Sequence, residues 1–208
     1  MLRTATIALV LLALAQGDAR EKPTIDGRIG EKEWAGARRE ELAGGGEVLL
    51  LRRGDFVYIA VRGPKQGLAS LCVAKGKSVR ILHASAAIGD AAFERWGDVW
   101  MKRRDFEWTL RDSPRSGEPT DQAKQDALMK AGWLANASAA GSPDREFQLA
   151  VNDIDYIGVT FLTTDNPMRV SYWPSTMSDD CRTVKIPQGY LPDTARFDPA
   201  SWVTLAKK

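Results

Sequence analysis

Two apolar stretches separated by a short polar turn form the clearest pattern in the chain. They lie between Gly46 and Gly63 and flank Arg53-Gly54-Asp55. A Gly-Asp pair between two such stretches predicts a β-hairpin, because glycine readily adopts the positive φ of a tight turn. Both faces of the second stretch are apolar, with Val57, Ile59 and Val61 on one face and Phe56, Tyr58 and Ala60 on the other. This pattern predicts a central strand that is covered on both faces.

Similar alternation recurs further along the chain. A second hairpin is predicted between Leu68 and Ser85, with Lys75-Gly76-Lys77 as its turn and with Val79, Ile81 and His83 sharing a face. In three later strands the residues expected to point inward are Phe147, Leu149 and Val151, then Ile157, Val159 and Phe161, then Met168, Val170 and Tyr172. Short strands at this spacing predict an all-β fold, an antiparallel β-sandwich of the jelly-roll or immunoglobulin-like kind.

One segment has helical periodicity instead. It runs from about Asp121 to Ala131, where Thr120 can cap its start and Gly132 suits the left-handed position after its end. Its narrow apolar stripe consists of Ala127, Leu128 and Ala131. We expect one short helix, inserted at the edge of the sandwich.

The first 15 residues have the pattern of a secretory signal peptide. Arg3 provides a positive start, residues 7–14 are almost continuously apolar, and Ala13-Leu14-Ala15 fits a cleavage site of small residues. The apolar run is too short to span a bilayer. We therefore expect a secreted or periplasmic protein without membrane insertion after signal removal. Residues 16–23 would form a flexible N-terminus before a single sandwich domain at residues 24–208.

Charge and cysteine content narrow the function classes. The chain has 29 Lys and Arg against 27 Asp and Glu, so removing Arg3 with the signal leaves 28 against 27. This near balance gives no electrostatic reason to expect nucleic acid or an anionic membrane as a partner. Cys72 and Cys181 are the only cysteines, and in an oxidising compartment they can form a disulfide. The alternative is a pair of buried free thiols.

A motif with a distinctive spacing opens the expected domain. Ile25-Asp26-Gly27 is followed by Glu31, Trp34 and Ala37 at three-residue steps, and later by Val57-Tyr58-Ile59-Ala60-Val61. This arrangement resembles the start of family 9 carbohydrate-binding-module-like domains, which belong to the DOMON-like group of β-sandwiches. The resemblance covers residues 24–63. Within the motif we expect Asp26-Gly27 to turn the chain and Trp34, in a short helical turn, to cover one end of the core.

The resemblance implies two kinds of ligand. Carbohydrate-binding members stack exposed tryptophans on sugar rings, often with bound calcium, whereas cytochrome-like relatives hold a haem with axial ligands that include methionine. Neither ligand set maps onto this sequence by motif. A haem would be noncovalent, because Cys-x-x-Cys-His is absent, and it would pair His83 with Met101, Met129, Met168 or Met177. The other interpretation of His83, the only histidine, is a partly buried side chain satisfied by a neighbouring strand.

Seven tryptophans are the most unusual feature of the composition. Aromatic faces suit sugar binding, because sugar C–H groups stack on them while polar neighbours bind the hydroxyls. Periodicity assigns Trp108 and Trp133 to the core. In the sequence "MRVSYWPS", by contrast, Trp173 shares its face with Arg169 and Ser171, which makes Trp173 the first candidate for stacking on a ligand.

A second candidate site is the segment "ERWGDVWMKRR". Trp96 and Trp100 flank a short turn there, and the charged side chains nearby are Arg95, Asp98, Lys102, Arg103 and Arg104. Aromatic and charged groups on one loop can form the rim of a sugar site. The alternative is a solvated charged loop with one aromatic ring tucked beneath it.

Other motifs point to structure or are absent. Asp153 with Asp155, and Asp179 with Asp180, lie in expected turns without the spacing of a calcium loop, and no nucleophile or phosphate-binding motif occurs. The sequence therefore favours an exported, noncatalytic binding module with carbohydrate as its ligand. Two alternatives are a periplasmic haem-binding domain for electron transfer and a structural or protein-interaction sandwich. Calcium is left open as a cofactor.

Overall fold

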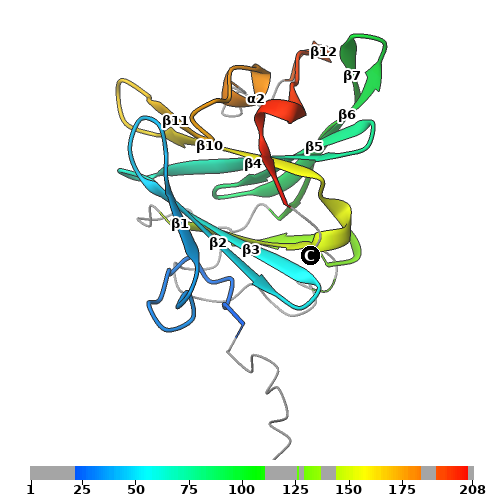
Figure 1. The fold of residues 1–208 in the computed structure, drawn as a ribbon. Helices are drawn as coiled ribbons and strands as arrows, with labels where there is room; N and C mark the ends of the chain where they lie inside the picture. The colour runs from blue at the N-terminus through cyan, green and yellow to red at the C-terminus, as the bar shows by residue number, and fades with distance from the viewer. Residues whose placement is uncertain (1–21, 111–125, 127–128, 137–143, 184–190, 206–208) are drawn as a thin grey trace, which may run out of the picture.

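The computed structural model describes residues 22–110, 126, 129–136, 144–183 and 191–205. Within them the chain forms two antiparallel sheets that pack as a β-sandwich, which confirms the predicted all-β class (Figure 1). The predicted signal peptide and most of the predicted helix at residues 121–131 lie outside the described residues. No helix in the described part is long and apolar enough to cross a membrane.

The first sheet has five strands and the second has eight. In spatial order, the first contains β1 (Arg38–Glu41), β2 (Glu47–Arg53), β3 (Phe56–Arg62), β9 (Asp144–Ala150) and β8 (Trp133–Ala135). The second contains β11 (Val170–Trp173), β10 (Tyr156–Thr163), β4 (Gly67–Lys75), β5 (Ser78–Ala84), β6 (Ile88–Trp96), β7 (Val99–Leu110) and β12 (Thr194–Ala195), and β13 (Val203–Thr204) pairs with β10. Short helices lie in connections between strands. Among them are η1 (Val151–Asp153) between β9 and β10, α2 (Asp180–Thr183) between β11 and β12, and η3 (Pro199–Ser201) between β12 and β13.

Both hairpins predicted from glycine-containing turns are present. Arg53 pairs with Phe56 across Gly54-Asp55, and Lys75 pairs with Ser78 across Gly76-Lys77. Gly54 and Gly76 have φ values of +56° and +55°, which is the conformation that required glycine. The prediction for β3 is also confirmed, because it lies in the middle of its sheet and residues 57–61 are buried on both faces.

Each sheet is covered on its outer face as well as its inner one. Between the sheets lies the main core, to which Ile59, Phe147 and Phe161 belong. A second core lies on the outer face of the eight-stranded sheet, where α2 and the C-terminal segment cover residues such as Ile81 and Phe93. Figure 1 shows these orange and red segments on one side of the sandwich and the blue N-terminal segment on the other. The N-terminal segment therefore covers the outer face of the five-stranded sheet, and the C-terminal segment with α2 covers the outer face of the eight-stranded sheet.

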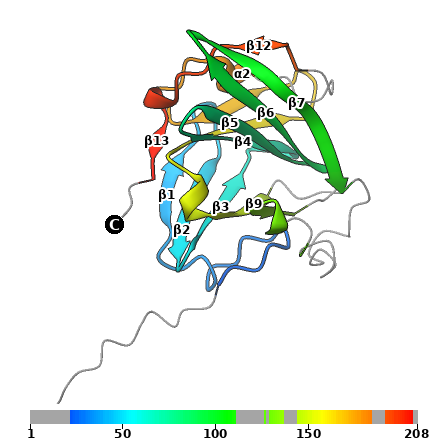
Figure 2. The same ribbon diagram turned by 90° about the vertical axis from the view of Figure 1, so that its right-hand side faces the viewer.

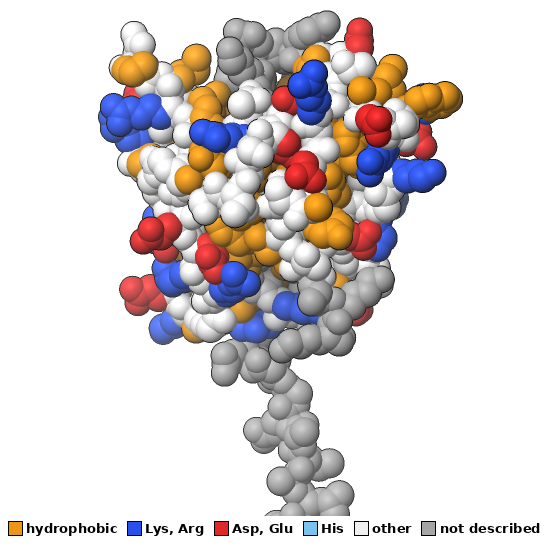
Figure 3. All heavy atoms as spheres, turned by 45° about the horizontal axis from the view of Figure 1, so that its top comes forward, with side chains coloured by type: hydrophobic (Ala, Val, Ile, Leu, Met, Phe, Trp, Pro, Cys, Tyr) orange, Lys and Arg blue, Asp and Glu red, His pale blue; other side chains and the backbone are white. Residues whose placement is uncertain are grey.

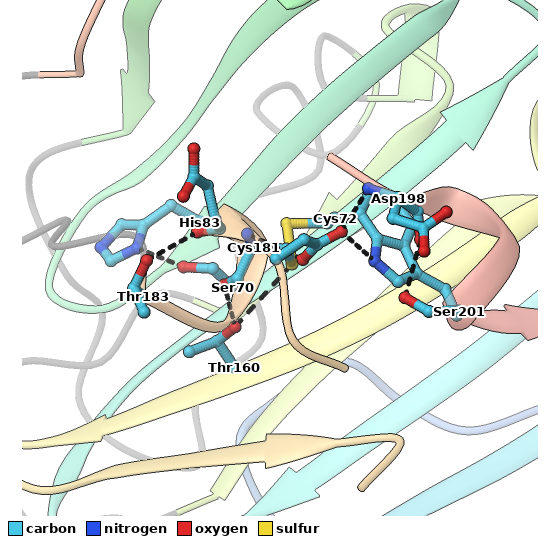
Figure 4. The surroundings of a disulfide bond; sticks show 11 residues. Ser70, Cys72, His83, Thr160, Cys181, Thr183, Asp198 and Ser201 are labelled. Carbon is cyan, nitrogen blue, oxygen red and sulfur yellow. Dashed lines mark hydrogen bonds between the residues drawn. A yellow bond between two sulfur atoms is a disulfide. The ribbon is translucent and has the colours of Figure 1, made fainter. Parts of the chain in front are cut away.

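A disulfide links the second of these covers, the C-terminal cover, to its sheet. Cys72 in β4 and Cys181 in α2 are bonded, with their Cα atoms 6.2 Å apart, and both are fully buried (Figure 4). Thr160 in the adjacent strand β10 donates a hydrogen bond from its Oγ1 to the Cys181 carbonyl at 2.7 Å. The predicted bridge is therefore confirmed, and the alternative of two free thiols is wrong.

The inward face of β11 was predicted incorrectly. Met168 and Val170 are 61% and 43% exposed, whereas Ser171 and Trp173 are buried. Both faces of this edge strand carry apolar side chains. The face with Trp173 is the buried one, because burying an indole removes more apolar surface from water than burying a valine. Tyr172, the third residue of the predicted inward face, packs half-buried against the second core instead, with the Arg182 guanidinium 4.2 Å from its ring centre.

The end of the predicted helix is visible. Asp126, Met129 and Lys130 are helical, and Gly132 has a φ of +81° while its N–H donates to the Met129 carbonyl. This is the left-handed helix ending that Gly132 predicted. Trp133, the next residue, is buried in the main core as expected.

Candidate functional site

The end of the β6–β7 hairpin presents the most exposed aromatic side chain of the described residues. Trp96 pairs with Val99 across a Gly97-Asp98 turn, and strand alternation puts Trp96, Glu94 and Arg103 on one face of the hairpin. The Trp96 side chain is 69% exposed. Figure 3 shows hydrophobic side chains set among charged ones on this side of the molecule.

Polar neighbours of Trp96 are held in place. The Arg103 guanidinium carbon lies 6.0 Å from the indole ring centre, and Arg103 Nε donates to Glu94 Oε2 at 2.8 Å. A cation at this distance is attracted to the face of the ring. Most of the indole is open to solvent, so the ring is accessible to a ligand.

An open pocket of about 260 Å³ lies on the other face of the same hairpin. Its walls include Arg95, Asp98 and Trp100 from the hairpin and Tyr156, Phe197 and Asp198 from β10 and the C-terminal segment. The hairpin end thus combines an exposed ring on one face with a polar, partly aromatic pocket on the other. Tyr156 and Asp198 could not be assigned to it from sequence, because they lie far from the hairpin along the chain.

Trp100 is a wall of this pocket and not a platform for stacking. It is only 3% exposed, its Nε1 donates to the Phe197 carbonyl at 2.8 Å, and its ring packs edge-on against that of Phe197. The C-terminal segment therefore covers the face that was expected to be open. Of the two tryptophans in the predicted rim, only Trp96 is available to a ligand.

The first-choice candidate, Trp173 with Arg169, is also corrected. Trp173 is 3% exposed and belongs to the main core, whereas Arg169 precedes β11 and is exposed. The residues share an alternation phase, but the strand begins only at Val170, so the phase does not carry over to Arg169. Trp173 still borders an open groove of about 570 Å³, together with Arg38, Glu40 and Ser175.

His83 is satisfied by its own neighbours. It is buried, and its Nδ1 lies 3.2 Å from Ser70 Oγ (Figure 4). Its Nε2 lies 2.9 Å from Ser85 Oγ. Burial, with a smaller contribution from the positive charge of Arg145, lowers the His83 pKa to about 3. The ring is therefore neutral at physiological pH, and both of its nitrogens already have partners.

The paired aspartates form turns and anchor the C-terminal cover. Asp155 accepts hydrogen bonds from Lys75 Nζ and the Gly76 N–H. Asp179 accepts from the indole Nε1 of Trp202 at 2.7 Å, as well as from two backbone N–H groups. Burial raises the pKa of Asp179. Within the described residues no group of three or more His, Cys, Asp or Glu is placed to bind a metal ion.

A buried carboxylate holds the N-terminal motif. Glu146 in β9 is 0% exposed, and its Oε2 accepts hydrogen bonds from the Asp26 and Gly27 N–H groups at 3.1 and 2.7 Å. Its Oε1 accepts from the Trp34 indole Nε1 at 2.9 Å. The spacing from Asp26-Gly27 to Trp34 thus brings three donors to one side chain. Trp34 covers the outer face of the five-stranded sheet, not an end of the sandwich core.

Glu146 was not identified from the sequence, because it alternates with the inward-pointing Phe147 and Leu149 of β9 and was therefore expected to face solvent. A usable signal did exist. The neighbouring strand β3 is apolar on both faces, and Glu146 lies opposite Ala60 in that strand. The segment that buries the outer face of β3 at Ala60 therefore also buries Glu146 beside it.

We expect Glu146 to make stability depend on pH. Burial raises its pKa to about 8, although the Gly27 and Trp34 donors oppose this shift. The folded state then binds a proton that the unfolded state releases near pH 4.5, so the stability from this group is complete below pH 4.5 and is lost as pH rises toward 8. In Glu146→Gln this loss, on the order of 4 to 5 kcal/mol between pH 4.5 and 8, should disappear.

Urea unfolding of both proteins at several pH values between 5 and 8 measures the effect. The comparison between them is needed because His83 acts in the opposite direction, its lowered pKa adding stability as pH rises toward 6.5. Equal pH slopes in the two proteins would show that Glu146 is ionised throughout.

No family model, curated protein or solved structure matches this chain. The resemblance of the N-terminal motif to family 9 carbohydrate-binding-module-like domains therefore stays a prediction, and the functional argument rests on the geometry.

Proposed function

We propose that the chain is an exported, noncatalytic binding module that recognises carbohydrate at the end of the β6–β7 hairpin. The observation that carries the proposal is the exposed Trp96 ring beside the Arg103–Glu94 ion pair. Trp96 shares its face of the hairpin with the exposed Val99 and Met101, and contiguous apolar patches rimmed by polar residues mark binding surfaces.

The chemistry of the hairpin suits a sugar on both of its faces. Sugar C–H groups can stack on the Trp96 indole, while Arg103 and Glu94 supply a donor and an acceptor for hydroxyls. The pocket behind the hairpin adds Arg95 and Asp98. The backbone that carries these groups is fixed by the β6–β7 pairing, so no loop has to be ordered when a ligand binds.

The buried disulfide supports export. Disulfides form and persist in oxidising compartments, and Cys72 and Cys181 are joined in this structure. The apolar segment at residues 7–14 supports the same proposal. A periplasmic or secreted location would place the hairpin in contact with cell-wall or environmental glycans.

Trp96→Ala tests the assignment. A glycan array with the wild-type protein selects the ligand, and calorimetry then compares the variant with wild type. We expect the affinity to fall at least tenfold because a central aromatic contact is removed. The free energy of unfolding should change by less than about 0.5 kcal/mol, since the ring is exposed.

Met168→Ala is the matched control, because Met168 is an exposed apolar side chain on a different hairpin. It should bind the selected glycan as wild type does. The proposal fails if folded wild-type protein binds no glycan across a broad panel, or if Trp96→Ala retains wild-type affinity. The first of these outcomes would favour a protein-interaction role for the Trp96 surface.

A further inference from the structure

A third open cavity, of about 410 Å³, lies on the side of the sandwich where the two sheets part. We call it the open-side groove. Residues of β1, β2 and β3 line it from one sheet, and β13, which pairs with β10, lines it from the other. Figure 2 shows β1 and β13 on the same side of the molecule. Its volume lies within the range of small-molecule sites in proteins.

Apolar side chains form most of this groove. They are Leu50, Leu51, Val57, Val151, Val203 and Leu205. Thr204 is the single uncharged polar residue in the lining, and the two charged residues are both cationic, Arg38 and Arg52. A sugar would find few hydrogen-bonding partners here. An apolar tail with an anionic head would match both parts of the lining.

Strand register brings the two arginines together. Arg38 of β1 lies directly opposite Leu50 of β2, and Arg52 follows Leu50 by two residues on the same face of the sheet. Arg38 and Arg52 are therefore diagonal neighbours, a relation close enough for long side chains to reach one ligand. Both point toward the side where the sheets part.

The guanidinium groups have donors to spare. Arg38 bonds Glu40 through Nε at 2.5 Å, and Glu40 is not part of this lining. The Arg52 side chain is exposed, and among the described residues it forms no ion pair or hydrogen bond. Two guanidiniums near one point can bind a carboxylate with charge-assisted hydrogen bonds.

We propose that the open-side groove binds an unbranched alkyl carboxylate, with its tail along the valine and leucine side chains and its head between Arg38 and Arg52. This site is separate from the β6–β7 hairpin and does not depend on carbohydrate binding. An inward-pointing charge on an edge strand also prevents edge-to-edge pairing of sheets, which would explain Arg38 on the edge strand β1 without a ligand. The experiment below separates the two explanations.

Calorimetric titration of the purified protein with decanoate tests the proposal. Decanoate should bind, hexanoate should bind at least tenfold more weakly because less apolar surface is buried, and decylammonium should not bind. In Arg52→Gln the affinity for decanoate should fall about tenfold or more. Lys77→Gln, which removes an exposed cation from the β4–β5 turn that is not part of the groove lining, should bind decanoate as wild type does.

Three results would overturn the proposal. One is a wild-type protein that does not bind decanoate, and another is decylammonium binding as tightly as decanoate. The third is an Arg52→Gln variant whose affinity equals that of Lys77→Gln. Because the ligand series uses wild-type protein alone, the test remains decisive even if a variant fails to fold.

Discussion

Replacing both Cys72 and Cys181 with alanine is expected to lower the free energy of unfolding by about 4 to 5 kcal/mol. The bond closes a loop across a sequence separation of 109 residues, which strongly restricts the unfolded chain. It also joins β4, an interior strand of its sheet, to α2 and thereby to the C-terminal cover. Guanidinium chloride unfolding followed by tryptophan fluorescence measures the change.

Wild-type protein kept reduced, which retains both side chains as thiols, is the control for the lost packing in the alanine variant. It should be destabilised by a similar amount, and in both samples Trp100 should become more exposed to quenchers, because Phe197 of the C-terminal cover packs on it. A loss below about 1 kcal/mol would mean that the cover is held by its other contacts alone.

Trp34→Ala should cost about 3 to 5 kcal/mol of stability. The indole is almost fully buried on the outer face of the five-stranded sheet. Its removal leaves a cavity and also deprives Glu146 Oε1 of the donor that it accepts from. Chemical denaturation of the purified variant gives the magnitude.

Trp34→Phe separates the two contributions. Phenylalanine retains most of the apolar surface and lacks the N–H, so the loss should be about 1 to 3 kcal/mol, the range for leaving a buried acceptor unsatisfied. If Trp34→Ala instead kept the wild-type melting temperature and lost glycan binding, Trp34 would belong to the ligand site and not to the core.

Local patterns predicted the parts of this fold that depend on neighbouring residues. Gly54 and Gly76 marked their hairpins because a tight turn needs positive φ, and β3 showed its two-sided burial in its own composition. The phase of β11 was different. The two faces of β11 are similarly apolar, and the packing of the opposite sheet decides which of them is buried. The local sequence does not show where that sheet lies, so the buried face could not be predicted from it.

The candidate site shows the same limit. The sequence placed Trp96 and Trp100 together on one charged loop, whereas the structure puts them on opposite faces of the β6–β7 hairpin. Local patterns could not show which face the C-terminal segment would cover, because Phe197 lies 97 residues beyond Trp100. The role of Glu146 was hidden for the same reason, since its donors come from the N-terminal motif.

The NMR signals of the tryptophan indole N–H groups test directly whether Trp96 is the ring on which a glycan stacks. Titrating the glycan selected by the array should shift the Trp96 signal, assigned from Trp96→Ala, and leave the signal of buried Trp34 in place. A saturating glycan that moves the Trp34 or Trp173 signal and leaves Trp96 unchanged would contradict the account.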